Sequence, residues 1–161
     1  SIFLITISQY NLPIMKELLY LKDEQIKDFI QLLFYAYRET FSDPKEILTK
    51  NAFGPAHLRA LNLIERNPGT CLGELIYQLK ITKQSLNRVL RDLLKSKMIK
   101  QIKDDEDTRK KNLFLDKDGK VFFDKIYEIQ KKRIVSALRN SEPDSVIKFK
   151  EVLNKIINGK N

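Results

Sequence analysis

The sequence LGELIYQLKITKQSLNRVLRDLLK, residues 72–95, contains two short amphipathic patterns separated by a tight break. Apolar residues recur at three- and four-residue steps on both sides of the break, as on one face of an α-helix: Leu72, Leu75, Ile76, Leu79, then Leu86, Val89, Leu90, Leu93 and Leu94. Thr82 can cap the second helix, because its hydroxyl can accept from the free amides of the first turn. Two short helices joined by such a turn predict a helix-turn-helix.

The outward face of the second predicted helix, residues 82–96, is polar and basic. Its hydrogen-bonding residues are Thr82, Lys83, Gln84, Ser85, Asn87, Arg88, Arg91 and Lys95. Such a helix can enter a DNA major groove, which is about 12 Å wide, where Gln and Asn pair with adenine and Arg pairs with guanine. We therefore predict that these residues bind double-stranded DNA.

A two-stranded hairpin is predicted directly after this unit, over residues 98–115, which makes the helix-turn-helix a winged one. Its polar turn contains four acids, 104–107, that would oppose anionic DNA. We expect these acids to cap the turn and hold neighbouring cations, while Arg109 reaches the minor groove with Lys110 beside it. The acids lack the alternating ligands and central glycine of a calcium loop, so we predict no metal site there.

Positive charge is concentrated in the same region. Residues 80–111 contain eleven basic and five acidic side chains, a net charge of +6 within a total of +9. Focused charge of this kind produces strong, salt-dependent affinity for DNA. The plainer interpretation, a merely solvated helix face, is less favoured because the turn, the cap and the hairpin agree with a DNA-binding role.

Further helices are predicted on both sides of the winged unit, which gives a mainly α (α+β) fold. Residues 23–41 carry a helical stripe rich in aromatics, which is either ordinary core or a subunit interface. A short helix over 44–50 and a helix beginning at Pro55 follow, and Asp116 is expected to cap a long helix over about 117–140. Pro143 begins a last helix.

The composition excludes several functional classes. The chain of 161 residues has one Cys and one His, which argues against disulfides, zinc fingers and a Ser-His-Asp triad. It has no phosphate-binding glycine loop and no apolar run long enough for a membrane span. We therefore predict a protein of the cytoplasm that is not an enzyme, needs no cofactor and has no membrane partner. Residues 1–14 are apolar and precede Met15; we interpret them as upstream read-through, a tag remnant or an added docking strand.

The sequence resembles the MarR family of winged helix-turn-helix transcriptional regulators over about residues 22–140. The resemblance is carried by GTCLGEL at 69–75, ITKQSLNRVL at 81–90, and Asp107-Thr108-Arg109 followed by LFLDKDG at 113–119. The segments LLFYAYR at 32–38 and FGPAH at 53–57 resemble the PetP-type branch of that family. Asp116 stands where the family usually has Thr, and the wing tip is more acidic than usual.

The resemblance implies a homodimer that binds a pseudo-palindromic DNA operator, with 82–96 as recognition helix and Arg109 as the minor-groove arginine. It implies four parts of the chain: an extension at 1–20, an N-terminal dimerisation helix at 21–50, the winged unit at 51–116 and C-terminal dimerisation helices at 117–161. Many members of the family respond to a small-molecule effector. The residues that could line a pocket for one here are Tyr35, Arg38, His57 and Arg59.

The residues also allow two other interpretations. A winged helix can serve as a protein-interaction module without specific DNA binding, although the basic helix face favours DNA. The thiol of Cys71 could sense an oxidant, as in some members of the family, but its position at the entry to the first helix favours buried packing. His57 lies on the predicted helix between Gly54 and Asn67, where a packing or interface role is favoured over that of an effector ligand.

Overall fold

The computed structural model describes residues 19–159, and the chain divides into two compact units with a boundary at Thr40 and Phe41. Helix α2 (Asp23–Ser42) occupies most of the described part of the first unit. The second unit contains α3 (Lys45–Lys50), α4 (Pro55–Arg66), α5 (Leu72–Leu79), α6 (Lys83–Lys95), β1 (Ile99–Lys103), β2 (Lys111–Leu115), α7 (Lys117–Arg139) and α8 (Pro143–Asn158). Helices with one small sheet confirm the predicted fold class. The prediction for residues 1–14 lies outside the described residues.

Helix α4 is the centre of the second unit. Pro55 occupies its first turn, where a missing amide hydrogen costs nothing, and Asn67 ends it. Its face Leu58, Leu61 and Ile64 is fully buried. Helices α5, α6 and α7 and strand β2 all contact α4, so its apolar face organises the core.

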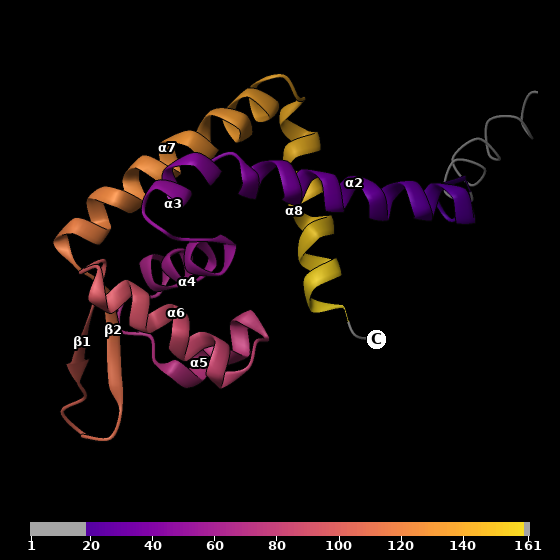
Figure 1. Ribbon diagram of the computed structural model, residues 1–161. Helices are drawn as coiled ribbons and strands as arrows, with labels where there is room; N and C mark the ends of the chain where they lie inside the picture. Colours follow the sequence, from indigo (N-terminus) through magenta and orange to yellow (C-terminus); the bar gives the residue numbers. More distant parts are fainter. Residues whose placement is uncertain (1–18, 160–161) are drawn as a thin grey trace, which may run out of the picture. The chain divides into compact units, whose positions relative to one another are not determined.

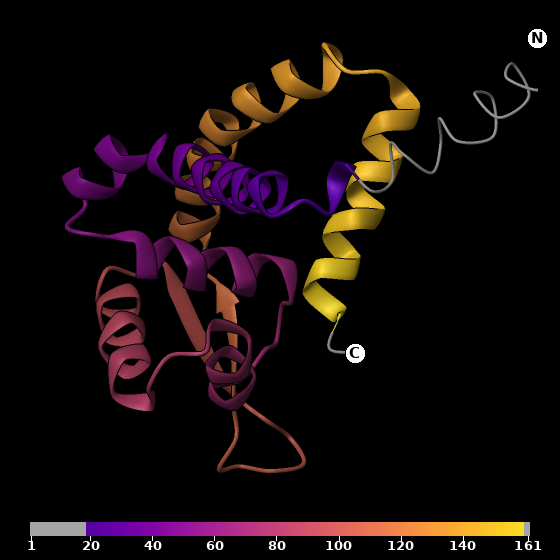
Figure 2. The ribbon, with the colours of Figure 1, turned by 90° about the vertical axis from the view of Figure 1, so that its right-hand side faces the viewer.

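The hairpin is antiparallel, with Ile99 opposite Leu115 and Lys103 opposite Lys111. Thr70 adds one more bridge to Leu113, because Gly69 N–H donates to the Leu113 carbonyl at 2.8 Å and Leu113 N–H donates to that of Thr70 at 2.8 Å. The segment before α5 is thereby fixed to the hairpin. Figures 1 and 2 show the turn of the hairpin extending beyond α5 and α6. We call residues 55–115 the head.

Helix α7 begins against the end of the head. The Asp116 side chain accepts from the Lys117 amide, as predicted for a cap, and Asp116 N–H donates to the Met98 carbonyl at 2.9 Å. Gly119 lies so close to Met98, the residue before β1, that a Cβ atom would stand 1.7 Å from the Met98 oxygen. Further along α7, Arg133 donates to both carboxylate oxygens of Asp43, at 2.6 and 2.7 Å. That hydrogen bond lowers the pKa of Asp43.

Helices α2 and α8 contain no buried residue. Their large apolar side chains are exposed instead, among them Phe29, Ile30 and Phe34 in α2 and Ile147 and Phe149 in α8. No helix within residues 19–159 is long and apolar enough to cross a membrane. The four-part division of the chain stays a prediction.

Candidate nucleic-acid interface

Helix α6 is fixed by a cap at its start and by an apolar face along its length. The Thr82 hydroxyl accepts from the Ser85 amide at 3.1 Å, so the predicted cap is confirmed. Leu86, Leu90 and Leu93 are buried, and Val89 is only 6% exposed. Because a helix repeats every 3.6 residues, burying this face turns the polar arc to the solvent.

The structure exposes every residue that was predicted on this arc: Thr82, Lys83, Gln84, Ser85, Asn87, Arg88, Arg91 and Lys95. The Thr82 and Ser85 hydroxyls are 2.9 Å apart and hydrogen-bond to each other, so they are partly occupied within the chain. Within residues 19–159 no hydrogen bond or ion pair engages the side chains of Gln84, Asn87 or Arg88. These three remain available to an external partner.

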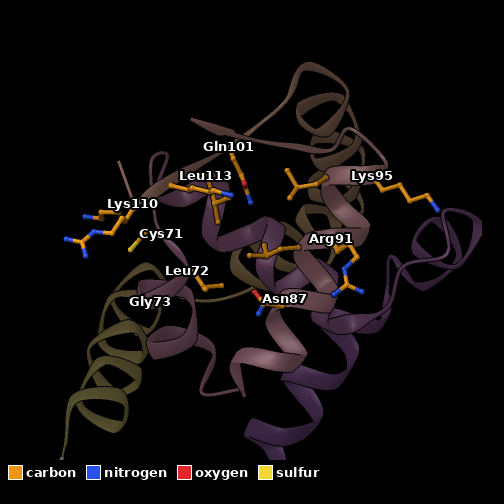
Figure 3. A pocket seen from close by; sticks show the side chains of 13 residues that line it. Cys71, Leu72, Gly73, Asn87, Arg91, Lys95, Gln101, Lys110 and Leu113 are labelled. Carbon is orange, nitrogen blue, oxygen red and sulfur yellow. The ribbon is translucent and has the colours of Figure 1, made fainter. Parts of the chain in front are cut away.

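A hollow of about 860 Å³ lies between α6, the start of α5 and the hairpin. Figure 3 shows its lining, with Lys110 on the hairpin across the hollow from Lys95 on α6. Arg91, Arg109 and Lys111 add further positive charge, and Leu90, Leu94 and Leu113 add apolar surface. Cations on two elements around one depression create a positive potential that attracts an anionic backbone.

The acidic turn of the hairpin is organised from within. Asp104 accepts from the amides of Glu106 (2.9 Å) and Asp107 (3.0 Å) and from the Asn112 side chain (3.1 Å). The Asp107 amide lowers the pKa of Asp104 most, followed by Asn112 and Glu106. These contacts confirm that acids cap the turn.

Arg109 follows this turn and is almost completely exposed. Its side chain is 94% accessible, and its Nε lies 3.6 Å from Asp107 Oδ1, while its amide donates to that oxygen at 3.0 Å. At this exposure the ion pair contributes little to stability. The Arg109 guanidinium is therefore free to exchange Asp107 for a phosphate or a base edge.

The charges of residues 80–111 are not distributed evenly between surface and interior. All eleven basic side chains are exposed. Two of the five acids, Asp92 and Asp104, are only half-exposed and have hydrogen-bond partners inside the head. Cations thus dominate the surface that α6 and the hairpin offer. No cluster of three or more possible metal ligands occurs within residues 19–159.

The four predicted effector-pocket residues belong to both units of the chain. On α2, the Arg38 guanidinium stacks 4.7 Å from the Tyr35 ring centroid, and Gln31 donates to the Tyr35 hydroxyl at 2.9 Å. On α4, His57 contacts Gly54 and Asp92 through its two ring nitrogens, and the buried Nε of Arg59 has no hydrogen-bond partner among the described residues. That these four residues share a pocket stays a prediction.

Cys71 differs from the expectation of buried packing. It is half-buried and lies at the edge of the hollow beside Leu72 (Figure 3). The reason is that Cys71 caps α5 before the first apolar position of that helix, so the helical pattern does not turn it into the core.

Three side chains of the candidate site were not predicted from the sequence. Gln101 and Lys111 line the hollow from the hairpin, and Asp92 contacts His57 across 35 residues of chain. The isolated acid at position 92, within an otherwise basic or neutral stretch from 80 to 103, was the available signal. Its partner could not be identified, because the contact depends on how α4 packs on α6.

Comparison with known proteins agrees with this fold. The model of the MarR family matches residues 53–110, which include the whole helix-turn-helix and the first strand. The HTH-type transcriptional regulator PetP of Rhodobacter capsulatus is 39% identical over 140 residues, covering 87% of this chain and 84% of the relative.

Solved structures with a similar fold have much lower sequence identity. A MarR family transcriptional regulator from Silicibacter pomeroyi superposes with a TM-score of 0.72 at 18% identity, covering 86% of this chain and 92% of the other. FabT of Streptococcus pneumoniae, solved in complex with DNA, superposes with a TM-score of 0.70 at 13% identity, covering 84% and 95%. With the sequence relationship to PetP and the matching family model, the chain belongs to the MarR family of winged helix-turn-helix transcriptional regulators.

Proposed function

We propose that this regulator binds double-stranded DNA as a homodimer and reads a pseudo-palindromic operator. The observation that carries the proposal is the separation of the two faces of α6. Leu86, Leu90 and Leu93 are buried, while the basic and amide side chains of the opposite arc are exposed beside a cationic hairpin. A solvated surface needs no such grouping, whereas a DNA duplex needs positive charge for affinity and hydrogen-bond donors for sequence.

Different residues have different roles in this proposal. Gln84, Asn87 and Arg88 lie in the first two turns of α6 and read base edges in the major groove. Lys83, Arg91 and Lys95 contact phosphates, with Lys110 joining them from the hairpin, and Arg109 enters the minor groove. Thr82 and Ser85 stabilise the first turn of α6, and their two hydroxyls face the DNA sugar-phosphate backbone.

The homodimer is supported by the exposed apolar faces of α2 and α8. Neither helix has a buried residue in the single chain, although each has several large apolar side chains. A two-fold dimer presents two heads to one duplex, with half-sites about 34–36 Å apart. A regulator of this kind acts in the cytoplasm, where the chromosome is. A small-molecule effector bound near Tyr35, Arg38, His57 and Arg59 belongs to the proposal as its regulatory part.

The test begins with selection of bound DNA from a random pool, followed by gel shifts with the selected duplex. Arg88→Ala should weaken binding about tenfold or more and relax the preference at one position, since it removes a base reader. Arg109→Ala should weaken binding to all sequences and make it less dependent on salt. Arg66→Ala is the matched control, because it removes one exposed arginine at the end of α4, which lies neither on α6 nor on the hairpin.

The outcomes separate the competing functions. Wild-type affinity that hardly changes between low and moderate salt, or equal losses in all three variants, would contradict DNA reading and favour the protein-interaction module. Full affinity for a single isolated half-site would contradict the dimeric operator.

A further inference from the structure

One polar contact joins the start of α4 to the second half of α6, at the edge of the apolar core. His57 Nε2 lies 2.9 Å from Asp92 Oδ2, and His57 Nδ1 accepts from the Gly54 amide at 3.1 Å. The imidazole is only 14% exposed, and its ring centroid lies 5.0 Å from that of Phe53. His57 is thus held at both nitrogens and on one ring face.

These two contacts determine where the imidazole proton lies. A neutral imidazole has one nitrogen that accepts and one that donates. Since Nδ1 accepts from the Gly54 amide, the hydrogen must be on Nε2, where it donates to the Asp92 carboxylate.

The position of Asp92 makes this contact relevant to α6. Asp92 follows Arg91 directly and lies one helical turn after Arg88. The buried side chains of the two helices, among them Leu61 of α4 and Leu86 and Leu93 of α6, belong to one apolar core cluster. Apolar contacts have little directional preference, whereas a hydrogen bond weakens steeply away from its preferred angle.

We propose that His57 is a positioning residue for the recognition helix: its Nε2–H bond to Asp92 fixes the rotation of α6 on α4 and so directs the base-reading Arg88 into the major groove. This role rests on the proposed DNA-binding function. It makes His57, which lies outside the DNA-facing surface, a further determinant of sequence recognition. The bond also draws the one carboxylate of α6 toward α4, away from the anionic partner.

Two substitutions test the two hydrogen bonds of His57, to the Gly54 amide and to Asp92, one at a time. His57→Asn retains an acceptor near the place of Nδ1, which can cap α4, but it is too short to reach Asp92. His57→Gln places its amide nitrogen near the place of Nε2, which can still donate to Asp92. Asp92→Asn serves as the charge control, because its amide oxygen still accepts from His57 while the negative charge is lost.

The first measurement compares affinity for the selected operator with affinity for unrelated DNA at one salt concentration. His57→Asn should lower the specific affinity about tenfold and leave the non-specific affinity unchanged, since the phosphate-binding cations are untouched. His57→Gln should recover most of the loss. Asp92→Asn should strengthen both affinities together and keep their ratio. Equal ratios in the wild type, His57→Asn and His57→Gln would overturn the proposal.

Two further measurements need no DNA. His57 is the only histidine in the chain, so the nitrogen NMR signals of its ring are unambiguous. The hydrogen should be on Nε2, and finding it on Nδ1 would overturn the proposal. Amide hydrogen exchange should become faster in α6 of His57→Asn but not in its α5, whereas uniform or unchanged exchange would again overturn it.

These measurements also distinguish a failure of the positioning role of His57 from a failure of the proposed DNA-binding function. If the wild type selects no sequence at all, the proposed function falls, and with it the reading role of the bond. Faster exchange confined to α6 would then still support the mechanical link from His57 to Asp92. If the wild type selects an operator and His57→Asn keeps full specificity, only the positioning role falls.

Discussion

The head and the terminal helices use the same kind of sequence pattern with opposite results. In α4 and α6 the apolar stripe is buried by neighbouring elements, with Leu58, Leu61 and Leu86 inaccessible to solvent. In α2 and α8 stripes of similar period contain no buried residue, and Ile147 in α8 is 59% exposed. The difference lies in the available partners, because the head supplies several short elements that cover one another.

The two regions would contribute to function in different ways. The head completes its own core and can offer a fixed polar surface to DNA. The terminal helices leave apolar area that a second copy of the chain can cover, and exposed patches of this kind are typical of subunit interfaces. Stability of the head should therefore depend on internal fit, and the state of α8 should depend on association.

The largest effect is expected at the tightest contact of the second unit. Gly119→Ala should lower the free energy of unfolding by about 3 kcal/mol or more, because its new methyl group would collide with the Met98 carbonyl, which cannot rotate away. Urea denaturation measures this loss. Gly73→Ala is the control, since nothing lies within 4 Å of its added Cβ and alanine favours a helix. Equal stability of both variants would contradict a rigid junction between head and α7.

A second prediction tests whether α8 needs a partner. Phe149→Asp should weaken self-association about tenfold or more, since it places a charge on a half-exposed apolar face. Sedimentation at several concentrations measures this change, and the NMR spectrum of the head should be retained. Asn154→Asp introduces the same charge at an exposed polar position of α8, and this variant should self-associate as the wild type does. A dimer unaffected by Phe149→Asp would remove α8 from the interface.

A smaller effect is expected at the start of α6. Thr82→Ala removes the hydroxyl that accepts from the Ser85 amide and should cost about 1 kcal/mol of unfolding free energy. Thr82→Ser keeps the acceptor and should retain most of that stability. Thermal unfolding of the two variants distinguishes them, and identical losses would show that the cap contributes nothing.

The smallest effect is local and concerns pH. The amide of Asp107, followed by the Asn112 side chain and the Glu106 amide, lowers the pKa of Asp104 below its usual 3.8. Because the pKa of Asp104 is lower in the folded state, its carboxylate stabilises the turn at any pH above the ordinary pKa. This contribution disappears as the pH falls through the lowered pKa of the folded state.

The amide NMR signals of Glu106 and Asp107 should therefore keep their hydrogen-bonded positions at pH 4 and shift only at lower pH. The Asp104→Ala variant provides the reference without this transition. A midpoint at or above 3.8 would contradict the hydrogen bonds in the turn.

Much of the architecture could be predicted because its signals are local. The steps of three and four residues in 72–94, the cap at Thr82 and the cap at Asp116 each depend on residues within one or two helical turns. The exposed arc from Lys83 to Lys95 followed from the same periodicity, since burying one face of a helix exposes the other. The capping role of the wing acids also followed from neighbours in sequence.

Features that depend on distant segments could not be predicted. The contact of His57 with Asp92 and the approach of Gly119 to Met98 join residues that are far apart along the chain.

The sequence by itself determined the helices, the hairpin, the excess of positive charge and the membership of a family of regulators. Only the tertiary structure decided that the hollow is lined from α5, α6 and the hairpin together, and that His57 is held between Gly54 and Asp92. The physical reason is that periodicity and capping act over a few residues, whereas a pocket or a cross-helix bond requires a particular packing of side chains that are distant in sequence.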